Sequence, residues 1–310
     1  MSDGDRRRID NVSLKYFDDA HQILDRRGRP LANVYWARVP RPLESVGTAY
    51  MIHGYGGSPI EPCMKLPMQT ALKNGFDVVA VEGAALSATS GADHKISDMN
   101  LARQKLAMLR GLTFARELTD LNQSYKIAWP HSISCRALAD LMVLVPEVRA
   151  YFDEIVLNNP YFMPPSRVQR TQEKYLSRDP SGKMWRTLLT RASKQMRQIE
   201  NVQYSVPTCL YNLSIPLPAQ WRATATSMEN LAYAMSSYLG AVRLYFVLGS
   251  ADDMAEYDLN VRLYDGVHAT NKELMVIPGA NHSFENALES YGTCTQKIFA
   301  DIRSRRLMQY

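Results

Sequence analysis

Short apolar segments alternate with longer amphipathic patterns along most of this chain of 310 residues. Strands that alternate with helices form a mostly parallel sheet with helices on both faces, so this alternation limits the fold more than any other feature. The predicted strands are Ala32–Val39, Gly47–Ile52, Phe76–Val81, Tyr125–Trp129, Glu154–Leu157, Arg243–Leu248 and Glu273–Ile277. The pattern also predicts a hairpin turn at Arg27–Pro30 and helices at Pro59–Asn74, Asp98–Leu118, Ser134–Val145, 256–266 and Asn286–Arg303.

Residues 161–237 interrupt this alternation directly after the predicted strand Glu154–Leu157. The stretch is rich in Arg, Gln, Met and Tyr, and it contains no convincing pair of strands. We therefore expect residues 1–160 and 238–310 to form one α/β core. We expect residues 161–237 to form a helical cap inserted over the carboxyl edge of the sheet, where open α/β sheets bind their ligands.

The positive charge of the chain is concentrated in the predicted cap. The whole chain has ordinary globular composition, with 46% hydrophobic and 22% charged residues, and a formal net charge of +5. Nine basic and two acidic residues lie between Ser166 and Arg197, so this segment carries +7 and leaves −2 for the rest. An excess this local does not indicate a nucleic-acid binder. The basic segment could bind an anionic partner at the cap. The alternative is that its charges only line a helix face in contact with solvent.

Targeting, membrane and metal-binding patterns are not apparent in the sequence. The first ten residues, MSDGDRRRID, are polar, and no window approaches the roughly 20 apolar residues of a membrane span. The four cysteines have no CxxC spacing, which predicts reduced thiols in a cytoplasmic protein. The histidines His21, His94, His131 and His268 do not have the spacing to Cys or carboxylate residues that a metal site needs. We therefore expect neither a metal nor a cofactor.

The loop His53–Gly57 follows the predicted strand Gly47–Ile52 and contains three glycines. Glycines at a strand end let the chain turn tightly and expose N–H groups. In serine hydrolases such a loop supplies one donor of the oxyanion hole, here the N–H of Tyr55. A dinucleotide-binding loop would need glycine in place of Pro59. An ordinary glycine-rich turn is the remaining alternative.

The segment after the predicted strand Tyr125–Trp129 resembles a nucleophile elbow. The usual pattern is G-x-S-x-G, whose small residues let the serine hydroxyl stand on a sharp turn before a helix. Here residues 130–134 read PHSIS, with proline and serine in place of the two glycines. We expect Ser132 to be the nucleophile and the N–H of Ile133 to be the second oxyanion donor. The alternative is a serine that only caps the next helix.

A candidate acid and a candidate base follow the last two predicted strands. Asp252 comes after the sixth strand, with Asp253 as the neighbouring alternative, and His282 comes after the seventh. A nucleophilic serine needs a general base within hydrogen-bond reach and a carboxylate that fixes the tautomer of that base. The sequence therefore predicts a triad of Ser132, Asp252 and His282.

These loops make the chain similar to the α/β-hydrolases over about 14–160 and 238–310. The resemblance rests on the HGYGG, PHSIS, GSAD and GANH loops. It implies an α/β-hydrolase fold with an eight-stranded, mostly parallel sheet and acyl-transfer chemistry at a Ser-His-Asp triad. The elbow Ser132–Arg136, with its second serine, also resembles the acyl-carrier-protein thioesterase of bacterial bioluminescence systems, as do Asn74–Phe76 and the doublet Asp252-Asp253.

The expected function is acyl hydrolysis or acyl transfer through an acyl-serine intermediate. A basic cap suits acyl-CoA or an acidic acyl carrier protein, so a thioesterase is the first hypothesis. The alternatives are a carboxylesterase, lipase or amidase acting on a small ester or amide, and a non-catalytic binding protein of the same fold. Four residues of the predicted cap are candidates for substrate binding: Arg167, Arg170, Lys174 and Trp185.

Overall fold

The computed structural model of the chain describes residues 6–8, 16–40, 44–54, 57–83, 101–119, 125–162, 236, 242–252 and 254–308. All seven predicted strands and all five predicted helices are present in these ranges. Most of the predicted cap at 161–237 lies outside them, together with Arg167, Arg170, Lys174 and Trp185. The division into core and cap therefore stays a prediction.

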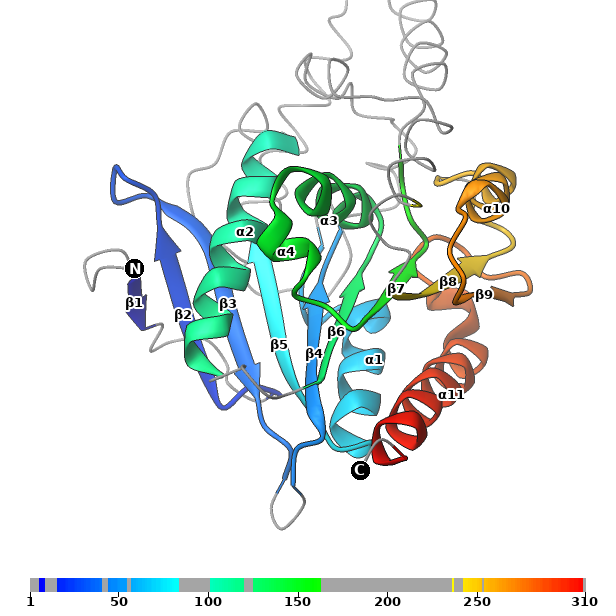
Figure 1. Ribbon diagram of the computed structural model, residues 1–310, viewed down its shortest axis with the longest axis horizontal. Coiled ribbons are helices and arrows are strands. Elements are labelled where there is room, and N and C mark those ends of the chain that lie inside the picture. The colour runs from blue at the N-terminus through cyan, green and yellow to red at the C-terminus, as the bar shows by residue number, and fades with distance from the viewer. Residues whose placement is uncertain are drawn as a thin grey trace, which may run out of the picture.

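A single sheet runs through the described part of the chain (Figure 1). Its nine strands are β1 (Arg6–Arg8), β2 (Asp19–Leu24), β3 (Pro30–Ala37), β4 (Gly47–Ile52), β5 (Phe76–Gly83), β6 (Tyr125–Pro130), β7 (Glu154–Asn158), β8 (Arg243–Gly249) and β9 (Lys272–Ile277). Their order across the sheet is β1-β2-β3-β5-β4-β6-β7-β8-β9. Pairing is antiparallel from β1 to β5 and parallel from β5 to β9. The expected eight-stranded, mostly parallel sheet is confirmed as β2 to β9, and β1 adds a short strand at one edge.

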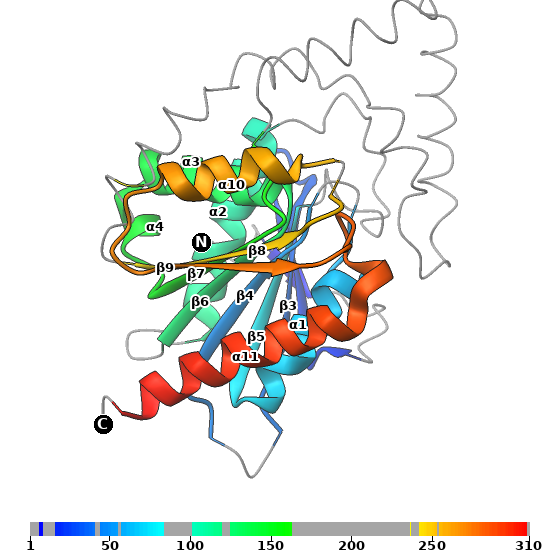
Figure 2. The ribbon, with the colours of Figure 1, turned by 90° about the vertical axis from the view of Figure 1, so that its right-hand side faces the viewer.

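Helices cover both faces of the sheet, as the alternation predicts (Figure 2). The described helices are α1 (Pro62–Lys73), α2 (Leu101–Leu118), α3 (Ile133–Leu144), α4 (Pro146–Arg149), α10 (Tyr257–Gly266), α11 (Leu288–Leu307) and a 3₁₀ turn, η5 (Glu285–Ala287). One face carries α1 and α11, which pack against each other, and the other face carries α2, α3 and α10. Because helices cover both faces of the sheet, a functional site is expected at the ends of the strands.

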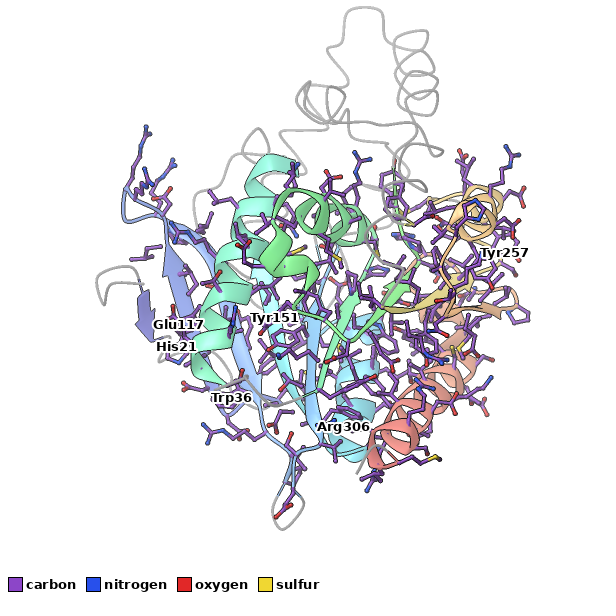
Figure 3. The ribbon with its side chains drawn as sticks, in the orientation of Figure 1. His21, Trp36, Glu117, Tyr151, Tyr257 and Arg306 are labelled. Atoms are coloured by element: carbon purple, nitrogen blue, oxygen red, sulfur yellow. The ribbon has the colours of Figure 1, made fainter. Side chains whose placement is uncertain are left out.

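The two faces have separate hydrophobic cores because the central strands are buried on both sides, as is usual in parallel sheets. On the face of α2 and α3, Tyr151 packs edge-on against Tyr50 of β4, with ring centroids 5.4 Å apart (Figure 3 labels Tyr151). On the opposite face, Trp129 of β6 stacks on Phe299 of α11 at 5.1 Å. These contacts fix the central strands between their helices, and so fix the position of the strand ends.

The N-terminal part of the sheet contains the predicted hairpin. β2 and β3 pair on either side of a turn at Asp25–Arg29, and the last residue of the predicted turn, Pro30, is the first residue of β3. Gly28 in this turn has a φ of 71°, a left-handed conformation that glycine adopts without strain. At the other end of the chain, α11 runs four residues beyond the expected end at Arg303, to Leu307. None of the described helices has the length and apolar character needed to cross a bilayer.

Candidate active site

Three loops at the carboxyl edge of the sheet bring Ser132, Asp252 and His282 together. The loops follow β6, β8 and β9, which run parallel and therefore end at the same edge. Oγ of Ser132 lies 2.8 Å from Nε2 of His282, and Nδ1 of His282 lies 2.8 Å from Oδ2 of Asp252. All three residues are buried. Because a carboxylate only accepts hydrogen bonds, Nδ1 carries the proton and Nε2 accepts from the serine hydroxyl.

Ser132 stands on a strained turn between β6 and α3. Its φ is 56° and its ψ is −126°, a conformation that residues other than glycine rarely adopt and that matches a nucleophile elbow. Pro130 takes the place of the usual glycine. It pairs with Ile52 of β4, and β6 pairs with β7 at Ile127 and Ala128 and again at His131. Because proline has no N–H to donate, the interruption of the ladder toward β7 falls at Pro130 itself.

The loop after β4 lies directly against the elbow. A Cβ on Gly54 would come within 2.8 Å of the Cβ of Ser132, so only glycine fits there. Ile133 is the first residue of α3, and N–H groups in the first turn of a helix have no partner within the helix. Its N–H is therefore a suitable donor to an oxyanion beside Ser132. Tyr55, the other predicted donor, lies outside the described residues.

Asp252 is held as an anion by its surroundings. Its Oδ1 accepts the backbone N–H groups of Met254 at 2.9 Å and of Ala255 at 2.8 Å, while its Oδ2 faces His282. Burial by itself raises the pKa of Asp252, but His282 and these two N–H groups outweigh burial, and the pKa lies below its ordinary value. Asp252 is therefore charged at neutral pH and can orient His282. Asp253, the alternative acid, lies outside the described residues.

The same fold occurs in solved structures of low sequence similarity. No protein-family model and no curated protein matches the sequence. A carboxyl esterase from Bacillus coagulans aligns with a TM-score of 0.64 and 12% identity, over 96% of this chain and 98% of that one. An esterase from Pyrococcus furiosus aligns with a TM-score of 0.60 and 15% identity, over 94% of both chains. An alpha-beta serine hydrolase homologue from Coxiella burnetii aligns with a TM-score of 0.53 and 11% identity, over 91% of this chain and 97% of that one. This chain has the α/β-hydrolase fold.

Within this α/β-hydrolase fold, His131 is a site residue to which the sequence analysis assigned no role. It lies beside His282, with ring centroids 5.0 Å apart, and its Nε2 donates to the main-chain carbonyl of His282 at 3.1 Å. Burial, followed by the nearby His282, lowers the pKa of His131 to about 3. His131 is therefore neutral and does not repel a proton on His282. Its place next to Ser132 is the one signal in the sequence that could have drawn attention to it.

Ser134 occupies the second glycine position of the elbow pattern and joins two loops of the site. Its Oγ donates to the main-chain carbonyl of His53 at 2.5 Å and accepts from Nε2 of Gln104 at 3.0 Å. All three residues are buried. The departure from glycine thus adds a hydrogen bond between the elbow and the end of β4.

Glu61 carries a partly buried carboxyl group close to the loop after β4. Its side chain accepts the N–H of Ser58 and, at 3.7 Å, the thiol of Cys63. Burial raises the pKa of Glu61 to about 7, with a further rise from Glu285 and an opposing effect of His282. Glu61 therefore changes its charge near neutral pH in the vicinity of His282. No motif in the sequence indicates this.

The predicted site residues thus divide into two groups. Ser132, Ile133, Asp252 and His282 lie together at one edge of the sheet. Tyr55 and the four candidates in the cap lie outside the described residues. In the ranges that the structure describes, no group of His, Cys, Asp and Glu side chains is arranged to hold a metal ion.

Proposed function

We propose that this chain is a serine hydrolase that cleaves acyl esters or thioesters through an acyl-serine intermediate. The observation that carries the proposal is the hydrogen-bond relay from Asp252 through His282 to Ser132, with both steps at 2.8 Å. A serine on a strained elbow, a base within reach and a carboxylate that orients the base are the parts that acyl transfer requires.

The reaction would proceed in two half-reactions at Ser132. His282 takes the hydroxyl proton while Oγ forms a bond to the acyl carbonyl carbon, whose oxygen becomes an oxyanion. The N–H groups of Ile133 and Tyr55 would hold this oxyanion, and one such donor contributes about 3 kcal/mol to the transition state. His282 then gives its proton to the departing alcohol or thiol as the C–O or C–S bond breaks. Water attacks the acyl-serine by the same route, which releases the acid and restores Ser132.

The charges around the relay support this mechanism. The low pKa of Asp252 keeps a negative charge beside His282 when the imidazole carries the extra proton. The low pKa of His131 keeps the neighbouring ring neutral, so no like charge opposes that protonation. The complete relay also argues against the alternative of a non-catalytic binding protein.

Two substrate classes have separate support. Two of the solved structures described above are named as esterases, which favours a carboxylic ester. The +7 segment between Ser166 and Arg197 favours an acyl thioester on CoA or on an acidic acyl carrier protein, because Arg and Lys bind phosphate and carboxylate groups. If the acceptor were an alcohol or amine instead of water, the same intermediate would serve an acyltransferase. An amide substrate has no support beyond the relay itself.

Covalent labelling tests the nucleophile. We expect a fluorophosphonate probe to form one adduct, located on Ser132 by peptide mass spectrometry, and no adduct in Ser132→Ala. The same substitution should lower the hydrolysis of p-nitrophenyl butyrate by roughly 10³-fold or more. A folded protein that the probe does not modify at Ser132 would support the non-catalytic alternative.

A comparison of esters with thioesters tests the substrate class. The rates on p-nitrophenyl esters, acyl-CoA and acyl carrier protein would be measured at low and high salt. If the cap binds an anionic carrier, kcat/KM for thioesters falls with salt and with charge reversal at Arg167, Arg170 and Lys174, whereas the ester rates do not. The carrier hypothesis would be ruled out if esters were hydrolysed much faster than thioesters and if the thioester rates did not change with salt concentration.

A further inference from the structure

Asn159 is a buried residue just beyond β7 that the proposed reaction does not use. Its φ is 41°, in the left-handed region that asparagine tolerates better than most residues. Its carboxamide forms hydrogen bonds to main-chain atoms of two other loops, and both of these loops carry triad residues. One buried side chain thus connects the main chains of both loops.

The amide nitrogen of Asn159 holds the loop of His282. Nδ2 donates to the carbonyl of His282 at 2.8 Å and to the carbonyl of Asn281 at 3.1 Å. The carbonyl of His282 also accepts from Nε2 of His131 at 3.1 Å. The main chain at His282 is therefore held from two sides, and the position of the imidazole depends on it.

The amide oxygen of Asn159 holds the loop of Asp252. Oδ1 accepts the N–H of Gly249 at 2.8 Å, and the carbonyl of Gly249 accepts the N–H of Asp252 at 3.1 Å. The two loops are also in close contact, because a Cβ on Gly249 would lie 2.4 Å from the carbonyl oxygen of Ala280. A shift of either loop would therefore disturb the other.

The backbone next to this amide reaches the nucleophile as well. The carbonyl of Asn158 accepts the N–H of Ser132 at 3.0 Å, and the N–H of Asn159 donates to Val247 of β8 at 2.8 Å. Hydrogen bonds from one short segment thus reach all three loops of the triad. Among the side chains, only Asn and Gln combine an amide donor and an amide acceptor in one neutral planar group.

We infer that Asn159 is a positioning residue that sets His282 against both Asp252 and Ser132, an inference that rests on the proposed function. Its contribution is geometric, since its hydrogen bonds go to the main chain and not to the reacting atoms. Misplacement of a catalytic group by about 1 Å costs about 100-fold in rate. Loss of Asn159 should therefore act on kcat and leave substrate binding unchanged.

Kinetics of two variants and a control test this inference. We expect Asn159→Ala and the isosteric Asn159→Asp, which loses the donor, to lower kcat for p-nitrophenyl butyrate about 100-fold with little change in KM. Asn74→Ala is the matched control, because Nδ2 of the buried Asn74 also donates to a main-chain carbonyl, that of Thr70, at 2.8 Å. It lies at the end of α1 and should retain the wild-type kcat.

A spectroscopic measurement separates this inference from the proposed function. The proton on Nδ1 of His282, bonded to Asp252, should give a low-field ¹H NMR signal that moves or broadens in both Asn159 variants and not in Asn74→Ala. If the wild-type protein is not a hydrolase, this signal alone decides the role of Asn159. Folded Asn159 variants with unchanged kcat and signal would overturn the inference. Failure of both variants to fold, while Asn74→Ala folds, would equally overturn it and show a purely structural role.

Discussion

At the scale of single residues, two carboxyl groups close to His282 have opposite electrostatic environments. Asp252 receives hydrogen bonds from two backbone N–H groups and from His282, which lower its pKa. The partial burial of Glu61 outweighs its hydrogen bonds from Ser58 and Cys63, so its pKa rises to about 7. The first group is charged throughout the physiological range, and the second changes its charge within that range.

This difference predicts a pH-dependent stability that Glu61 causes. The folded chain keeps the Glu61 proton up to about pH 7, whereas the unfolded chain releases it near the ordinary value of 4.5. The folded state binds more protons in this window, so its stability falls as the pH rises, by about 3 kcal/mol in total. Glu61→Gln cannot lose a proton and should become more stable than the wild type between about pH 5 and pH 8.

Urea unfolding of both proteins across this pH range measures the effect. The advantage of Glu61→Gln should be small at the acid end and grow toward pH 8. Glu273, which pairs with Lys297 at 3.5 Å, supplies a control. Because exposed ion pairs contribute little, Glu273→Gln should change the free energy of unfolding by less than about 1 kcal/mol. A pH-independent difference for Glu61→Gln would contradict a raised pKa.

At the scale of elements, the site depends on close contact between the loop after β4 and the elbow before α3. Gly54 leaves no room for a Cβ beside Ser132, and the hydroxyl of Ser134 bonds to the carbonyl of His53. The elbow stores backbone strain at Ser132, and such strain persists only where surrounding contacts fix the conformation. The two loops therefore support each other.

Gly54→Ala should disturb this contact with a large loss of activity. The added methyl group would lie 2.8 Å from the Cβ of Ser132, so one of the two loops must move. A displacement of about 1 Å predicts a fall in kcat of about 100-fold, measured with an ester substrate. Gly292→Ala in α11 is the control, since its Cβ would meet Leu66 at an ordinary 3.5 Å. Equal activity of the two variants would contradict the contact.

At the scale of the whole molecule, packing on the face of α1 and α11 holds the strand that leads to Ser132. Trp129 is fully buried in β6, three residues before Ser132, and stacks on Phe299 of α11 with an interplanar angle of 9°. The terminal helix therefore contributes to the position of the elbow, although it is remote from it in the sequence.

Phe299→Ala should lower the free energy of unfolding by about 3 to 5 kcal/mol, because it leaves a cavity against Trp129. Urea denaturation measures the change. Met308→Ala, close to the end of α11 and 81% exposed, is the control and should change stability by less than about 0.5 kcal/mol. A similar loss in both variants would show that the stack is not the cause.

Local patterns in the amino-acid sequence are enough to predict the elements and the order of the site residues. Buried strands and amphipathic helices follow from hydrophobic periodicity, which is a local property, and the parallel direction of β6, β8 and β9 follows from the alternation of strands with helices. Once the strands are parallel, residues just after them meet at one edge. Ser132, Asp252 and His282 could therefore be predicted to lie together, as the structure places them.

The way in which these residues are held depends on contacts between segments that are distant in the sequence. Pro130 pairs with Ile52 of β4 at the point where the ladder between β6 and β7 is interrupted, and no local pattern shows these neighbours. Glu61 has a raised pKa because of burial, and His131 and Asn159 bond to the carbonyl of His282 from positions more than 100 residues away. Local sequence patterns report turns and periodicity. They do not report hydrogen bonds and burial between distant segments, which arise only when the sheet has brought its loops together.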